Sequence, residues 1–124
     1  MRTVASEWEF DVRRGPGWLL VRLLAPSDGS PHLPPLADQL WSLLESHFVY
    51  RLVLELHEIR RLDRPLLGQL VQLYRRIHQH GGMVRLCGLS PLNRRILENH
   101  GLIGRLPPYE NVEEAVMGIS HKPR

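Results

Sequence analysis

The sequence of 124 residues has one cysteine, one lysine and only eight aromatic side chains. A single Cys87 excludes a disulfide within the chain, and its position at the end of an apolar segment predicts a buried, inert thiol. No run approaches the roughly 20 apolar residues that a membrane-spanning helix needs. The N-terminus has no basic segment followed by an apolar one, so we expect no signal peptide and a cytoplasmic protein.

Positive charge comes almost entirely from arginine, which makes up fifteen of the sixteen basic residues in a chain of net charge +3. Most arginines stand in scattered pairs, without interleaved aromatic residues and without a helix-turn-helix or zinc-finger pattern. We therefore interpret them as solvated surface residues and expect no nucleic-acid binding. The exception is the cluster of Arg60, Arg61 and Arg64 in a predicted turn, which suits an acidic partner surface.

The sequence also lacks a convincing catalytic set. His78 and His80 are two residues apart, so they do not share a helical face as a metal-binding pair would. His57, Glu58 and Asp63 lie near one turn, where we interpret them as exposed turn residues. Neither a glycine-rich phosphate loop nor a Gly-x-Ser-x-Gly nucleophile motif is present. We expect a protein that is not an enzyme and has no metal or cofactor.

The central region predicts a strand, a helix and a second strand. Apolar segments at 52–56 and 83–87 flank a helix whose apolar residues recur at spacings of three and four. Pro65 suits the first turn of that helix, with Asp63 or Arg64 as its N-cap. Gly81 is placed to end it with a positive φ. The two strands of such a unit lie parallel in one sheet.

The remaining chain predicts an α/β fold. We expect a hairpin of strands at 7–12 and 18–24, further helices beginning at residues 36, 91 and 111, and a short strand at 103–106. Together these give a mixed sheet of four to five strands, with about four helices mainly on one face. Residues 1–119 form one domain and residues 120–124 a flexible tail. Within the apolar strand at 52–56, Glu55 needs either a buried partner or an exit to solvent.

Several short motifs resemble, in their order and spacing, the STAS domain of bacterial anti-sigma factor antagonists. The family has Asp-Ser-Ser-Gly-Leu-Gly at the start of its central helix, and Asp63 and Gly68 match its first and last positions. The segment Cys87–Pro91 resembles the family's Gly-Leu-Ser-Pro corner. Ile96–Leu102 and Asn111–Ala115 resemble its leucine-rich helix and the start of its last helix. The resemblance covers most of the chain and implies a STAS-like fold with a binding role.

One departure from the family pattern concerns its switch. In the family, the second serine of the motif is phosphorylated by a partner kinase that is also the anti-sigma factor. Arg64 and Pro65 occupy the two serine positions here, and Leu66 replaces the glycine. No serine or threonine lies between Ser46 and Ser90. The resemblance therefore implies binding to an anti-sigma factor or a related kinase-like protein, with no phosphoacceptor and a degenerate phosphorylation motif.

Three hypotheses for the function remain open. The first is a protein-interaction module that binds an anti-sigma factor without control by phosphorylation. The second is a STAS-like docking subunit of a transporter or signalling complex, and the third is a domain that binds a small molecule, nucleotide or lipid. A homodimer is left open as well. The surface predicted for the partner comprises Asp28, Arg61, Asp63, Arg64, Pro65, Leu66, Gln69 and Ser90.

Overall fold

A computed structural model describes residues 9–24 and 35–118 of the chain. Strands and helices follow one another along these residues in an α/β order. Their bounds are β1 (Glu9–Gly15), β2 (Trp18–Leu24), α1 (Leu36–His47), β3 (Arg51–Glu55), α2 (Arg64–Gln79), β4 (Met83–Cys87), α3 (Pro91–Asn99), β5 (Pro108–Tyr109) and α4 (Val112–Met117).

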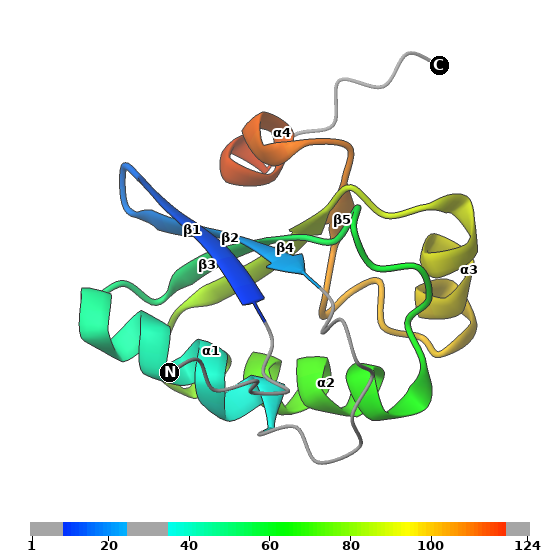
Figure 1. Cartoon of the computed structure of the whole chain (residues 1–124), viewed down its shortest axis with the longest axis horizontal. Coiled ribbons are helices and arrows are strands. Elements are labelled where there is room, and N and C mark those ends of the chain that lie inside the picture. The colour runs from blue at the N-terminus through cyan, green and yellow to red at the C-terminus, as the bar shows by residue number, and fades with distance from the viewer. Residues whose placement is uncertain (1–8, 25–34, 119–124) are drawn as a thin grey trace, which may run out of the picture.

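The strands form one five-stranded sheet in the order β1-β2-β3-β4-β5. β1 and β2 pair antiparallel as a hairpin, and each later strand pairs parallel with its predecessor. Helices α1 and α2 lie under one face of the sheet, α4 lies over the other, and α3 flanks the edge that carries β5 (Figure 1). The prediction of a mixed sheet with four helices is confirmed.

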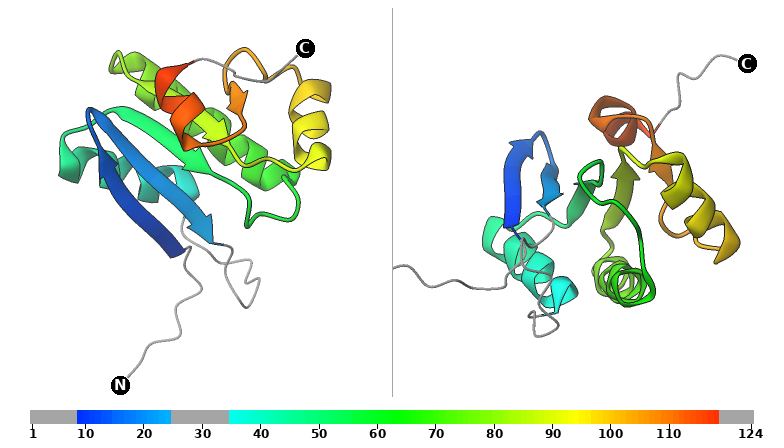
Figure 2. Two further views of the ribbon diagram at one scale, coloured as in Figure 1. Left: turned by 90° about the horizontal axis from the view of Figure 1, so that it is seen from above. Right: turned by 45° about the vertical axis from the view of Figure 1, so that its right-hand side comes forward.

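Two apolar clusters hold these layers together. The larger lies between the sheet and α1, α2 and α3, and takes Leu52 and Leu54 from β3. The smaller lies under α4 and takes Val53 from the same strand. Side chains of a strand alternate between its faces, so the central parallel strand is buried on both. Figure 2 shows α4 over the middle of the sheet, and the smaller cluster extends from Ala115 of α4 to Trp18 and Leu20 of β2.

The glycine pair after α2 has two separate tasks. Gly81 has a φ of 73° and makes the turn that follows the helix. A Cβ on Gly82 would clash with the carbonyl oxygen of Tyr50, which accepts a hydrogen bond from the Met83 N–H at 3.0 Å. Gly81 is therefore needed for its positive φ. Gly82 is needed because a side chain there would prevent β4 from starting close beside β3.

The structure corrects some of the predicted boundaries. The predicted strand at 103–106 is wrong: these residues form a turn in which Leu102 C=O accepts from the N–H groups of Arg105 and Leu106. The last strand is Pro108–Tyr109 instead. The first strand continues past its predicted end at residue 12 to Gly15, so the hairpin turn is confined to residues 16–17. Residues 7 and 8 and the predicted tail at 120–124 lie outside the described residues.

Candidate protein-interaction site

The segment between β3 and α2 is attached to the larger core and to α3. Ile59 and Leu62 are buried in the larger core. Asn93 of α3, itself 0% exposed, accepts a hydrogen bond from the Leu62 N–H at 2.8 Å and donates one to the Ile59 C=O at 3.0 Å. Both polar ends of the amide are therefore used to attach this segment to α3. The side chains between those two contacts are held on a fixed backbone.

The same segment leads into a capped helix. Asp63 has an extended backbone, and its Oδ1 accepts a hydrogen bond from the Leu66 N–H at 3.0 Å. Arg64 and Pro65 are the first two residues of α2. Of the two N-cap candidates, the structure selects Asp63. Its carboxylate satisfies a free N–H in the first turn, and proline in that turn sacrifices no backbone bond.

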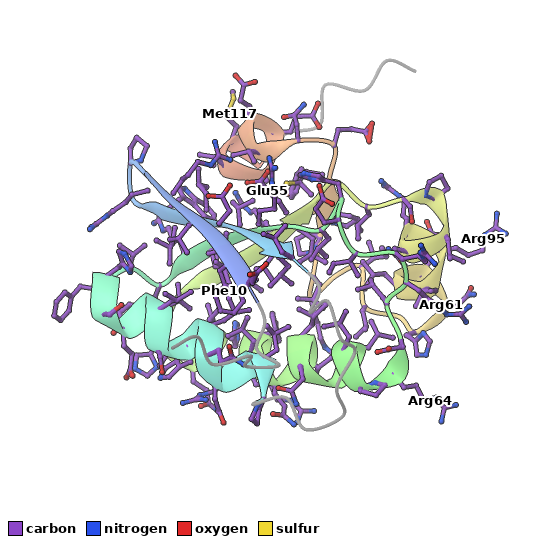
Figure 3. All side chains as sticks on the ribbon, viewed as in Figure 1. Phe10, Glu55, Arg61, Arg64, Arg95 and Met117 are labelled. Atoms are coloured by element: carbon purple, nitrogen blue, oxygen red, sulfur yellow. The ribbon has the colours of Figure 1, made fainter. Side chains whose placement is uncertain are left out.

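The residues predicted to contact a partner differ in their exposure at this helix start. Arg61, Asp63, Arg64 and Pro65 are exposed. Leu66 is 7% exposed and packs in the larger core, so the prediction that its side chain contributes to a surface is corrected. The third residue of the helix faces the sheet, whereas the first two face outward. Figure 3 shows Arg61 and Arg64 at the same end of the molecule as α3.

The other predicted surface residues have roles inside the fold. The Gln69 Oε1 accepts from the Ala37 N–H at 2.9 Å, which attaches α2 to the first turn of α1. The Ser90 Oγ accepts from the Asn93 N–H at 3.1 Å, so Ser90 is the N-cap of α3. Both side chains are half-buried. Asp28, the remaining member of the predicted surface, lies outside the described residues.

A second polar region lies on the α4 side of the sheet. Glu55 is 4% exposed, with its Oε2 2.7 Å from Arg13 Nη2 and its Oε1 3.6 Å from Arg22 Nη2. The hydrogen bond and the charge of Glu55 raise the pKa of Arg13. Of the two expectations for Glu55, the buried partner is confirmed. An open pocket of about 280 Å³ adjoins it, lined also by His57, Cys87 and the loop before α4.

This pocket does not have the features of a reaction centre. Burial raises the pKa of the Cys87 thiol to about 12, so the nucleophilic thiolate is scarce near neutral pH. Glu55 is already paired with arginines, and His57 is exposed. Across residues 9–24 and 35–118 there is no group of three potential metal ligands. In the same ranges, no helix has the length and apolar character needed to cross a bilayer.

Comparison with known proteins identifies the family. The model of the STAS domain matches residues 9–115. The chain belongs to the STAS domain family. An anti-sigma F factor antagonist of Paenibacillus polymyxa is 32% identical to this STAS domain over 65 residues, which are 52% of the chain and 56% of that protein. The match thus spans little more than half the length of that relative.

Solved structures share the fold at low sequence identity. An anti-sigma factor antagonist from Mycobacterium paratuberculosis has a TM-score of 0.70 at 18% identity, covering 90% of this chain and 93% of the other. A putative anti-sigma factor antagonist from Thermotoga maritima gives 0.69 at 16%, covering 89% and 93%. The Bacillus protein SpoIIAA in its phosphorylated form gives 0.62 at 15%, covering 89% and 98%. These likenesses show that the chain has the STAS fold.

Two residues that shape the site were not identified from the sequence. Asn93 was overlooked, although it stands four residues before Leu97 and so shares the inward face of α3. A buried polar residue at such a position must find partners, and the loop before α2 supplies them. The predicted first strand ended at residue 12, so the contact of Arg13 with Glu55 was not foreseen. The strand register, which pairs Arg13 with Leu20, shows that Arg13 belongs to β1.

Proposed function

We propose that this STAS domain is a non-catalytic, cytoplasmic interaction module that binds an anti-sigma factor. The partial match to the P. polymyxa anti-sigma F factor antagonist supports this assignment. The observation that carries the proposal is the exposed Arg64–Pro65 step on the capped start of α2. It gives a partner a rigid, accessible surface at the position where the family motif lies.

The proposed module works without phosphorylation at the helix start. Arginine and proline occupy the serine positions of the motif, and neither side chain has a hydroxyl group. The flanking serines, Ser46 and Ser90, both use their hydroxyl groups within the fold: Ser46 Oγ donates to the Leu43 C=O at 2.9 Å, and Ser90 Oγ caps α3. A partner with kinase activity would thus bind this surface without modifying it.

Binding to purified anti-sigma factors from the native host tests the proposal. Calorimetry should detect a complex with at least one of them. Arg64→Glu should weaken that complex about tenfold or more, because it reverses a charge at the proposed contact. The matched control is Arg75→Glu, which makes the same exposed charge change eleven residues further along α2. The proposal is wrong if no anti-sigma factor binds, or if Arg64→Glu and the control have equal effects.

A further inference from the structure

Four exposed arginines lie around the start of α2 and on α3. Arg60, Arg61 and Arg64 come from the loop and the helix start, and Arg95 comes from α3. We call these four residues the arginine patch. Figure 3 shows Arg61, Arg64 and Arg95 at one end of the molecule, directed outward. The two hydrogen bonds of Asn93 attach the loop to α3 and so fix the position of the loop arginines relative to Arg95.

The charges of the arginine patch are not neutralised within the described part of the chain. None of its four guanidinium groups has a hydrogen bond or ion pair with another described residue. Other arginines do have such contacts: Arg13 pairs with Glu55, Arg76 with Asp38, and Arg94 with Glu98. Unpaired positive charges at one end of the molecule attract an acidic surface, which would supply the carboxylates that the chain itself does not.

An exposed apolar side chain adjoins the arginine patch. Leu92 is 47% exposed and lies three residues before Arg95, on the same side of α3. Pro65 and Pro91 are exposed at the two helix starts. Arginine is enriched in protein-binding surfaces, and an exposed apolar side chain beside it adds area that a partner can bury.

We propose that the arginine patch and Leu92 form one docking surface that extends the α2 contact onto α3 and binds an acidic surface of the partner protein. This inference rests on the proposed function, because it specifies the chemistry of the same partner. Arginine fits carboxylates through paired N–H donors, so aspartate and glutamate side chains are the expected contacts. Leu92 contributes an apolar contact beside them.

The local charges favour a protein as the partner. They disfavour both DNA and an anionic membrane, whose phosphates are closely spaced. Glu58 and Asp63 are exposed among the arginines, and Glu98 stands three residues after Arg95. These carboxylates would repel closely spaced phosphates, whereas a protein surface can place its own charges to suit both signs. In addition, none of the aromatic residues of the described chain belongs to this surface, so it offers no platform for stacking bases.

A pair of charge-reversal variants tests the docking surface. The first is Arg61→Glu with Arg95→Glu. The control is Arg14→Glu with Arg75→Glu, which makes the same change in net charge at two exposed arginines that also have no partner in the described chain. Arg14 is next to the last residue of β1, beside the hairpin turn. Figure 1 shows that turn at the opposite end of the molecule from α3. All four residues are exposed, so both proteins should fold normally.

The probe is the anti-sigma factor that binds the unchanged chain. The patch variant should raise the dissociation constant at least tenfold relative to the control, mainly through a slower association rate. Leu92→Ala should weaken binding as well, with little change in salt dependence. Affinity of the unchanged chain should fall with added salt, and this fall should be smaller in the patch variant.

Each contrary result has a distinct meaning. If the anti-sigma factor binds the unchanged chain and both double variants equally well, the docking surface is wrong while the proposed function stands. If no anti-sigma factor binds the unchanged chain, both are wrong. Duplex DNA and phosphatidylserine vesicles are the further probes. Binding of either that is lost only in the patch variant would show that the arginine patch recognises phosphate, and would overturn the inference.

Discussion

Arg13 of β1 and Glu55 of β3 meet across the strand between them, with 2.7 Å between Nη2 and Oε2. Arg22 of that middle strand is paired in register with Glu55 and lies 3.6 Å from the other carboxylate oxygen. One buried carboxylate thus links three neighbouring strands on the α4 side of the sheet. A buried charge depends on such partners, because its desolvation is costly when it is left alone.

Removing Arg13 should therefore destabilise the fold. We expect Arg13→Ala to lower the free energy of unfolding by about 1–2 kcal/mol, a value reduced from that of a fully buried pair because the Arg13 side chain is half exposed. Urea unfolding provides the measurement. Asp38→Asn is the control, since it removes an ion pair whose two partners are both exposed and should cost less than about 1 kcal/mol. Equal losses in the two variants would contradict the structural role of the Glu55 pair.

Asn93 should matter for both stability and binding. Asn93→Ala leaves the Leu62 N–H and the Ile59 C=O without their partner, which we expect to lower the free energy of unfolding by about 2–3 kcal/mol. The loop that carries Arg61 should also loosen, so that partner affinity falls. Chemical denaturation and hydrogen exchange of the Leu62 amide measure these effects. Asn99→Ala, at the exposed end of α3, is the matched control and should change neither stability nor partner affinity. If the Leu62 amide kept its protection in Asn93→Ala, the role of Asn93 in holding the loop would be refuted.

Phe48 is in an unfavourable conformation at the end of α1. Its φ is 54°, and its side chain is 85% exposed, so little packing offsets the strain of a left-handed backbone. Phe48→Gly should raise the free energy of unfolding by about 1 kcal/mol, because glycine adopts this conformation without a steric cost. Phe48→Ala removes the ring but keeps the Cβ, and should bring little of that gain. Thermal unfolding of the two variants separates the contribution of the backbone from that of the ring.

Much of the fold could be predicted from local patterns. The apolar spacing of α2 and the strands beside it predicted a parallel unit, because that periodicity depends on neighbours only a few residues apart. The turn at 103–106 was misassigned because its short apolar stretch fits a strand as well as a turn. The hydrogen bonds to Leu102 that decide between the two depend on how the chain leaves α3.

The candidate site was predicted less completely. The position of Pro65 in the first turn of α2 was enough to place Arg64 and Pro65 at the helix start and in the predicted partner surface. The partners of Glu55 and Asn93 were not predictable in the same way. Arg13 is 42 residues from Glu55, and Leu62 is 31 from Asn93, so these contacts exist only once the sheet and α3 are assembled. Leu66 was misjudged because a helix start contains both inward and outward positions.

The proposal that the helix start has no phosphoacceptor is tested most directly by the intact mass of the protein after incubation with ATP and an anti-sigma factor that has kinase activity and is found to bind the chain. Pro65→Ser is the matched variant. It places a hydroxyl group at an exposed position that the inward Leu66 side chain leaves open, and it should gain one phosphoryl group under the same conditions. We predict that the unchanged chain keeps its mass and stays bound. A phosphoryl group on any residue from 57 to 70 of the unchanged chain would contradict it.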